Sequence, residues 1–248
     1  MEEGGKMSGK IITNVKKLSV LICSVSHRAA LLGRLMKVLE PQATNDVEIL
    51  VDRDSGQISI GAKRNKLLQK ACGKFSCFVD DDDLVSKEYV KKILDAIEDN
   101  PDCVGIEGLM TTNNKNPKKF IHSVRYDSWF EKDDVYYRTP NHLNPVRREL
   151  ALSVLFPEIN HGEDRSYSDR LYPFLKKENY IDDIIYYYLF LPQKKKVFLN
   201  NKMKSIETKI GKPPPINKEE ALRIIKNNTP GQNIKFDPGY RYKLRGRQ

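Results

Sequence analysis

Phe75-Ser-Cys-Phe-Val-Asp-Asp-Asp-Asp83 is the stretch that decides the fold, because it joins a short apolar run directly to four consecutive carboxylates. The apolar part has the length and composition of a buried strand. In open α/β sheets, ligands bind at the carboxyl ends of the strands, which is where the carboxylates stand. Clustered carboxylates suit Mg²⁺ or Mn²⁺ bridged to phosphate oxygens. The alternative interpretation is a solvated acidic turn that precedes the next helix.

Strands and helices alternate on both sides of this stretch. Short apolar runs predict strands, and apolar residues spaced by three and four predict helices. Such alternation favours a doubly wound α/β sheet. Ser26 and Ser86 are expected to cap the helices that follow them. The predicted strands cover 17–25, 47–51, 75–79, 103–107 and 184–191, and the predicted helices cover 26–39, 60–72, 87–100, 147–155 and 166–177.

The remaining middle segment, 111–148, is irregular and rich in aromatic residues, which favours antiparallel strands and a binding loop. Along an extended chain, the carboxylates of Asp80 and Asp82 would point one way and those of Asp81 and Asp83 the other.

Two further polar clusters stand next to predicted helices. His161-Gly-Glu-Asp164 precedes one helix, and its acids either complement the helix dipole or supply a general base. Gly61-Ala-Lys-Arg-Asn65 opens another helix, and its two cations either bind an anionic ligand or form an exposed basic face.

Composition limits the class of protein. The chain has 248 residues, of which 39% are hydrophobic and 31% charged, as expected for a globular protein. The apolar runs are too short to span a bilayer, and the first ten residues lack the apolar core of a signal peptide. The four cysteines have no zinc or redox spacing, which is typical of a reducing compartment. We therefore expect a cytoplasmic protein without a transmembrane segment.

Positive charge is concentrated at the C-terminal end. The net charge is +10, yet residues 194–248 hold fifteen Lys or Arg against four acids, so +11 lies there and the rest carries −1. Such a segment attracts phosphate-rich partners such as nucleic acid or an anionic membrane, although it can equally be a solvated tail. The expected organisation is a lead at 1–16, a catalytic domain at 17–192 and a basic extension at 193–248.

Five motifs in order resemble the family 2 nucleotide-sugar glycosyltransferases, which have the GT-A fold. They extend over about residues 17–192, and none is specific alone. The motifs are Leu18-Ser-Val-Leu-Ile-Cys-Ser24 as first strand, Val51-Asp-Arg-Asp-Ser-Gly56 as acidic turn, Gly61-Ala-Lys-Arg-Asn65, Asp80-Asp-Asp82 as the DxD-type motif, and Glu163-Asp164. The resemblance implies a GT-A (Rossmann-like) α/β fold with a mixed, mainly parallel sheet flanked by helices.

The resemblance also implies roles for these residues, with UDP-sugar as donor and Mn²⁺ or Mg²⁺ as cofactor. Asp164, together with Glu163, would be the catalytic base that deprotonates an acceptor hydroxyl. The nucleotide-sugar would be bound by Asp52, Asp54, Arg64, Asp80 and Asp81, the metal by Asp82 and Asp80, and the acceptor by His142, Asn144, Arg147 and Trp129. The sequence departs from the family at Asp52-Arg-Asp54 and in having four aspartates, which leaves these roles open by one or two positions.

The sequence leaves several classes of acceptor open. Basic residues interleaved with aromatics at the C-terminus suit phosphates and exposed bases, and the chain is similar to phage-type enzymes that glycosylate hydroxymethyl-pyrimidines in DNA. The residues expected to bind DNA are Lys194, Lys195, Lys196, Arg241, Lys243 and Arg245. Alternatives are a transferase that builds a surface glycan or glycolipid at the cytoplasmic membrane face, a non-catalytic nucleic-acid-binding protein, and a nucleotidyltransferase.

Overall fold

The computed structural model describes residues 16–190. The basic extension and its candidate nucleic-acid-binding residues therefore lie outside the described residues, as does nearly all of the N-terminal lead.

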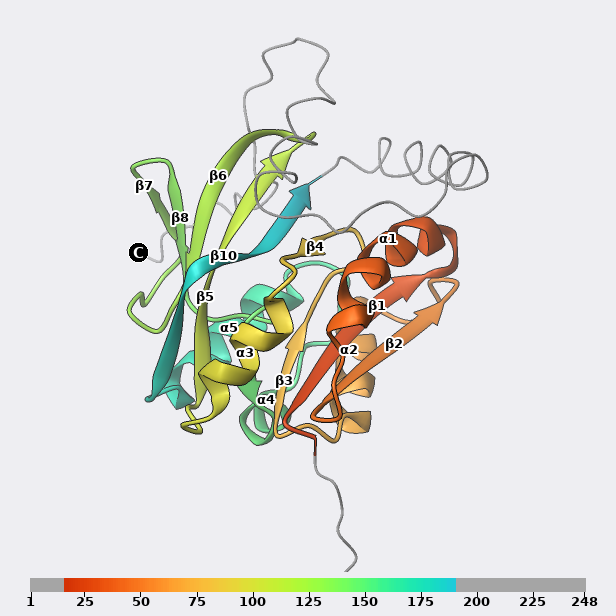
Figure 1. Ribbon diagram of the computed structural model, residues 1–248, viewed down its shortest axis with the longest axis horizontal. Coiled ribbons are helices and arrows are strands. Elements are labelled where there is room, and N and C mark those ends of the chain that lie inside the picture. The colour runs from red at the N-terminus through yellow and green to blue at the C-terminus, as the bar shows by residue number, and fades with distance from the viewer. Residues whose placement is uncertain (1–15, 191–248) are drawn as a thin grey trace, which may run out of the picture.

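One mixed sheet forms the centre of the described part (Figure 1). Its path is β2-β1-β3-β9-β5-β6-β8-β7. Strand β10 pairs with β5 on the side opposite β6, and it also pairs with β4. The strands that run in one direction are β1 (Leu18–Val25), β2 (Val47–Asp54), β3 (Phe75–Phe78), β5 (Cys103–Thr112), β7 (Phe130–Lys132) and β10 (Glu178–Phe190). The opposite strands are β4 (Leu84–Val85), β6 (Lys115–His122), β8 (Val135–Arg138) and β9 (Val146–Arg147).

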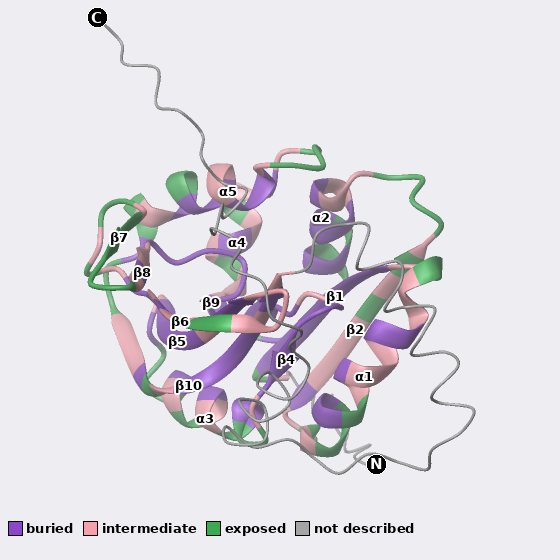
Figure 2. Ribbon diagram, turned by 90° about the horizontal axis from the view of Figure 1, so that it is seen from above, coloured by how far each residue is buried: buried purple, intermediate pink, exposed green. Residues whose placement is uncertain are grey.

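Helices cover both faces of this sheet (Figure 2). One face carries α1 (Ala29–Leu39) and α3 (Tyr89–Ile97), and the other carries α2 (Ile60–Lys70), α4 (Arg148–Val154) and α5 (Glu163–Leu171). Short 3₁₀ turns are η1 (Ser26–Arg28), η2 (Glu40–Gln42) and η3 (Tyr172–Phe174). β1 contributes to both cores because its side chains alternate: Val20 and Ile22 pack in one, Leu21 in the other. A strand covered on both faces reads as a continuous apolar run.

The fold class predicted from the sequence is confirmed, and the differences lie at the element ends. β2 continues through Asp54 instead of ending at Val51, and β10 starts at Glu178, six residues before the predicted start. The two serine caps are wrong. Ser26 donates its hydroxyl to the Asp54 carbonyl (2.9 Å), and the N-cap of α3 is Glu88, which makes no side-chain cap. The middle segment is only partly antiparallel, because β6 and β8 pair in parallel.

The strand directions decide which residues can meet. β1, β2 and β3 end together at one edge of the sheet, and Asp80 to Asp83 follow β3 directly at this carboxyl edge. The N-terminal turn of α5, which contains Glu163 and Asp164, approaches the same edge through its contact with α2. The amino edge of the sheet, where β3 and β5 begin, lies at the other end of these strands.

Candidate active site

Arg64 on α2 connects the two acidic clusters. Its guanidinium lies 3.1 Å from Asp80 Oδ1 and 3.6 Å from Glu163 Oε1. The same group lies over the rings of Phe78 and Phe156, with 4.9 and 5.7 Å to the ring centroids. Burial alone would lower the pKa of Arg64, yet the neighbouring carboxylates, chiefly Asp80, hold it above its usual range. Arg64 is therefore a permanent buried cation between the aspartate run and α5.

In the motif Gly61-Ala-Lys-Arg-Asn65, the glycine and the asparagine are explained by the packing of α2 against the loop before α5. The Gly61 amide donates to the Ile159 carbonyl (3.2 Å), and a Cβ at position 61 would overlap the carbonyl oxygen of Pro157. Asn65 accepts from the Phe156 amide (2.7 Å) and donates to the Phe156 carbonyl (2.9 Å). These contacts bring Arg64 to Glu163.

The exposed basic face considered for this motif is wrong, since Lys63 and Arg64 are both 3% exposed. Lys63 Nζ donates to the Ser24 carbonyl (2.7 Å) and pairs with Asp54. Asp52 pairs with Lys66, 3.0 Å away. Both predicted nucleotide-binding aspartates of β2 thus face α2, next to the end of β1.

Asp81 and Asp82 converge on Arg28, which follows β1. One Arg28 nitrogen lies 2.5 Å from Asp81 Oδ1 and 2.5 Å from Asp82 Oδ1. Ser24 also donates its hydroxyl to Asp81 Oδ2 (2.7 Å). Burial raises the pKa of Asp81 to about 7, and the adjacent Asp82 acts in the same direction. Two crowded carboxylates share one cation here.

Asp83 has a structural part in the fold. Its carboxylate is fully buried and accepts from the Tyr186 hydroxyl (2.8 Å) and from the Leu189 amide (2.8 Å). The predicted alternation along the aspartate run is wrong, because the chain turns here and the Asp83 amide donates to the Asp80 carbonyl (3.0 Å). Asp80 faces Arg64, while Asp81 and Asp82 face Arg28.

A small cavity lies between Asp80 and the candidate base Asp164, and both residues line it. His142 also lines this cavity, with Nε2 3.5 Å from Asp80 Oδ2. Asp164 accepts the Arg165 amide at Oδ1 (2.8 Å) within the first turn of α5. Its neighbour Glu163 has a raised pKa because it is buried, although Arg64 opposes this effect. A group bound in the cavity would contact both acidic clusters.

The four predicted acceptor residues have different surroundings. His142 lines the cavity, whereas the Asn144 side chain is engaged within the protein, donating to the Val104 carbonyl (2.9 Å). Trp129 donates its indole N–H to Thr139 (2.8 Å), and the guanidinium groups of Arg138 and Arg165 each lie 4.7 Å from the centroid of its ring. Trp129 therefore lies beside α5, the helix that carries Asp164.

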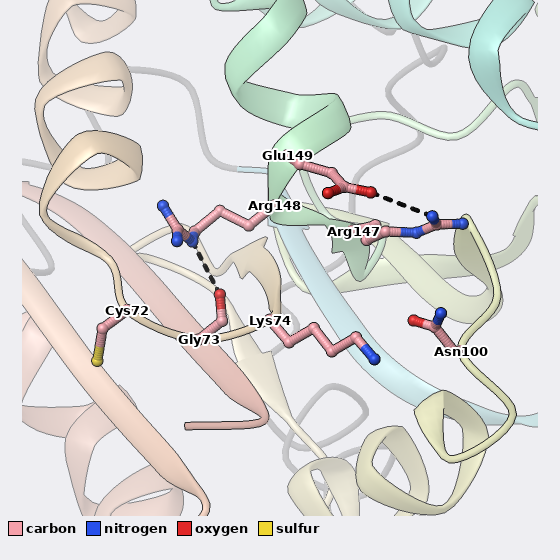
Figure 3. Close-up of a pocket in the computed structure, with 7 residues that line it drawn as sticks. All are labelled: Cys72, Gly73, Lys74, Asn100, Arg147, Arg148 and Glu149. Atoms are coloured by element: carbon pink, nitrogen blue, oxygen red, sulfur yellow. Dashed lines mark hydrogen bonds and ion pairs between the residues drawn. The ribbon is translucent and has the colours of Figure 1, made fainter. Parts of the chain in front are cut away.

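Arg147 does not belong to this site. It pairs with residue Phe75 at the start of β3, so it lies at the amino edge of the sheet. There it forms ion pairs with Asp102 and Glu149 and lines a separate surface pocket (Figure 3). The acceptor assignment for Arg147 is corrected accordingly. The reason is that β9 runs antiparallel, which brings its last residue back to the amino edge.

Sequence reasoning missed Arg28 and His122. Arg28 follows the first strand, so its position after a carboxyl end was a usable signal. His122 ends a strand in the irregular segment and carries no motif; it lines the cavity only because β5 and β6 pair.

The donor set for a divalent metal can be tested against these contacts. Within residues 16–190, no group of three or more His, Cys, Asp or Glu side chains is arranged to hold a metal ion. The residues do offer one convergent pair of carboxylates, Asp81 and Asp82, around the Arg28 nitrogen. Mg²⁺ commonly uses one or two carboxylates and takes further ligands from water and substrate phosphates. The pair fits such an ion.

The fold is a mixed α/β fold of the GT-A type. Residues 34–151 match the family model described as Glycosyl transferase family 2. This match agrees with the enzyme class predicted from the sequence, a glycosyltransferase.

A curated relative and several solved structures agree with this domain. "Putative glycosyltransferase EpsH" of Bacillus subtilis (strain 168) is 26% identical over 171 residues, covering 61% of this chain and 47% of that protein. The chain thus spans about half the length of the curated relative it matches. S. aureus TarS 1-349 is 17% identical, with a TM-score of 0.52 over 86% of this chain and 71% of that one.

The same TarS segment in complex with UDP is 18% identical, with a TM-score of 0.53 over 85% of this chain and 71% of that chain. Its complex with UDP-GlcNAc is 16% identical, with a TM-score of 0.53 over 86% and 72%. At these identities the likeness establishes the fold. No helix within residues 16–190 is long and apolar enough to cross a membrane.

Proposed function

We propose that this chain transfers a sugar from a UDP-sugar to a hydroxyl group of an acceptor, with inversion at the anomeric carbon. The observation that carries the proposal is the cavity lined by both Asp80 and Asp164. In a displacement with inversion, the attacking oxygen and the leaving diphosphate stand on opposite sides of the sugar. Two acidic clusters that face one cavity from different elements supply that arrangement.

The nucleotide would bind along the carboxyl ends of β1, β2 and β3. Asp52 and Asp54 would hold the uracil or ribose, and Asp80 would stand near the ribose, with Arg64 keeping its carboxylate in place. Support for UDP comes from the TarS segment of the same fold, which has been solved with UDP and with UDP-GlcNAc.

A divalent cation would be held by Asp81 and Asp82, with Arg28 displaced toward the diphosphate. When bound, Mn²⁺ or Mg²⁺ stabilises the negative charge on the leaving diphosphate. Arg28 is the natural second counter-charge, because it already neutralises both carboxylates.

Asp164 would act as the general base. Its carboxylate takes the proton of the acceptor hydroxyl while that oxygen attacks the anomeric carbon. The bond between this carbon and the diphosphate oxygen breaks, and UDP leaves with the bonding electrons. Arg64 and Glu163 fix the position of α5 relative to Asp80, so the distance between the base and the donor is fixed as well.

The acceptor stays a prediction from the sequence. Hydroxymethyl-pyrimidine DNA is favoured by the charge of residues 194–248, which are +11 in net charge. A surface glycan is the alternative, and the comparisons give DNA no support. Both acceptors belong in the same assay.

The test uses the full chain with Mn²⁺, a panel of UDP-sugars, and hydroxymethyl-cytosine DNA, plain DNA and glycan acceptors. Asp164→Asn should lower turnover by about 10²–10⁴-fold while UDP binding, measured by calorimetry, stays unchanged. Asp169→Asn is the matched control, because Asp169 lies on the same helix with a half-exposed carboxylate paired to Arg165. It should keep full activity.

Two results would contradict the proposal. Failure of the wild-type protein to bind any UDP-sugar would remove the donor assignment, and full turnover by Asp164→Asn would remove the base. Mass spectrometry of the products identifies the acceptor that gains the sugar.

A further inference from the structure

His122, at the end of β6, is a buried histidine with one unused nitrogen. The residue is fully buried, and its Nδ1 lies 3.2 Å from Asn144 Oδ1. Nε2 is buried as well and has no hydrogen-bond partner among residues 16–190. An unsatisfied buried polar atom is costly, so a native protein that keeps one usually has a use for it. His122 lines the cavity between Asp80 and Asp164.

The contacts of Asn144 decide which nitrogen of His122 carries the proton. Asn144 Nδ2 donates to the Val104 carbonyl (2.9 Å), so the other side-chain atom is the oxygen. That oxygen also accepts the Asn141 amide (3.0 Å). As it can only accept, His122 Nδ1 must be the donor, and Nε2 then keeps its lone pair.

The ring also stays neutral. Burial lowers the pKa of His122 well below its usual range, and the nearby cation Arg138 acts in the same direction. His122, which lines the cavity, therefore keeps a hydrogen-bond acceptor at Nε2 at physiological pH.

The cavity is small, and part of its lining is apolar. Its volume is about 30 Å³, which is enough for about two water molecules. Met110, Phe120 and Tyr188 line it together with His122 and the two aspartates. A sugar ring bound between Asp80 and Asp164 would therefore lie at the mouth of this cavity, and one substituent that bears a hydroxyl would enter it. The carbon of such a substituent would contact the apolar lining residues, and its hydroxyl would contact a polar one.

We propose that His122 is a specificity-determining residue that accepts a hydrogen bond from one hydroxyl group of the donor sugar, with Asn144 as its positioning residue. This inference rests on the proposed function. The donor sugar is the group in question because it must lie between the diphosphate, near Asp80, and the base Asp164. A donor whose hydroxyl at that position is missing or turned away would leave Nε2 without a partner.

Two substitutions separate the roles of the two ring nitrogens. His122→Asn keeps an N–H near the position of Nδ1 for Asn144 but places no atom at Nε2. His122→Gln reaches the position of Nε2 and can present an oxygen there. Calorimetry on the full chain measures the affinities for UDP, for UDP-glucose and for UDP-glucose analogues lacking one hydroxyl at the 2, 3, 4 or 6 position, and UDP-galactose and UDP-GlcNAc complete the panel.

We expect wild-type protein to lose about tenfold in affinity when one particular hydroxyl is removed. His122→Asn should bind UDP normally, bind the intact donor about tenfold more weakly, and be insensitive to removal of that hydroxyl. His122→Gln should restore most of the difference. A merely structural role of His122 would weaken UDP and UDP-sugar alike and would not be tied to one hydroxyl.

The outcomes separate this inference from the proposed function. If wild-type protein binds no UDP-sugar, the donor assignment fails and this inference falls with it. If wild-type protein is sensitive to one hydroxyl and His122→Asn keeps that sensitivity, only the inference is overturned. It is also overturned if His122→Asn leaves donor affinity unchanged and raises only the KM for the acceptor.

Discussion

The two edges of the central sheet carry similar residues in different surroundings. At the carboxyl edge, Arg64 pairs with Asp80 and its side chain is 4% exposed. At the amino edge, Arg147 pairs with Asp102 and its side chain is 24% exposed. In the first pair, Asp80 lines a cavity together with the candidate base, and in the second, Arg147 lines an open surface pocket (Figure 3).

The difference shows what distinguishes a functional ion pair from a structural one here. Asp102 also accepts the amides of Lys176 and Lys177 (2.8 and 2.9 Å), so the amino-edge pair holds the chain that enters β10. At the carboxyl edge, Arg64 also lies 3.6 Å from Glu163 and so joins two motifs that are about one hundred residues apart. The cavity beside it is lined by His122 and His142 as well. Ion pairing alone, which both edges have, does not mark the site.

The largest effect that tests this comparison is removal of the two arginines. Arg64→Met leaves Asp80 and Glu163 buried without their cation, and we expect a loss of about 3–5 kcal/mol in the free energy of unfolding. Arg147→Met leaves a carboxylate that is still bound by two amides, so the loss should be about 1 kcal/mol. Urea unfolding of the two variants measures both values.

Equal losses in the two variants would contradict the distinction between the edges. UDP binding provides a second readout, because Arg64→Met should weaken it and Arg147→Met should not.

A smaller effect is expected at two glycines that sit at close approaches. A Cβ at Gly61 would overlap the Pro157 carbonyl, and one at Gly73 would overlap Ser19 and the backbone of Leu18. Gly61→Ala and Gly73→Ala should each cost about 1–3 kcal/mol. Only Gly61→Ala should also lower turnover, measured well below the unfolding temperature, because only this contact positions Arg64.

Gly33 on α1 is the control for the substitution itself. No atom of residues 16–190 lies within 4 Å of a Cβ there, so Gly33→Ala should stabilise the protein by about 0.5–1 kcal/mol. If Gly73→Ala lowered turnover as much as Gly61→Ala at equal stability, the amino edge would contribute to the reaction, and the distinction between the two edges would be wrong.

The smallest effect is a pair of opposite pH dependences. Burial raises the pKa of Asp81 to about 7, so between pH ~4 and ~7 the unfolded chain releases a proton that the folded protein keeps. Asp81 therefore lowers stability as pH rises through this window. The pKa of Asp102 is lowered. Burial would raise it, but the amides of Lys177 and Lys176 and the cation of Arg147 outweigh this effect. Its contribution is present above pH ~4 and is lost as pH falls through its folded-state pKa.

Thermal unfolding of metal-free protein from pH 3 to 8 checks both signs. Relative to wild type, Asp81→Asn should gain stability as pH rises from 4 to 7, while the deficit of Asp102→Asn should shrink below pH 4. Parallel curves for the two variants would show that the edges do not differ in this way.

Much of the fold could be predicted because it depends on local patterns. Apolar runs of four to eight residues gave the strands, and the position of Asp80 to Asp83 directly after one of them predicted the carboxyl edge. The ends of elements were less predictable. β2 extends through Asp54 because it pairs with β1 up to Val25, which is a contact between strands and not a local preference.

The candidate site was predicted in part. Arg64, Asp80, His142, Glu163 and Asp164 are brought together, as their motifs implied. Arg147 was misplaced because the edge at which a residue lies depends on the direction of its strand. Asn144 was given a contact with the acceptor, but its polar atoms are used by Val104, Asn141 and His122.

The sequence by itself determined that a sheet of mostly parallel central strands carries acids at one edge, because period and run length are properties of neighbouring residues. Only the tertiary structure decided which acid does what. Asp83 became structural because Tyr186, more than one hundred residues away, binds it. Asp81 and Asp82 face Arg28, and Asp80 faces Arg64, because a turn breaks the extended chain and distant cations fill the positions around it. Such partners come together only when the strands pair, so four identical neighbours in sequence acquire different environments.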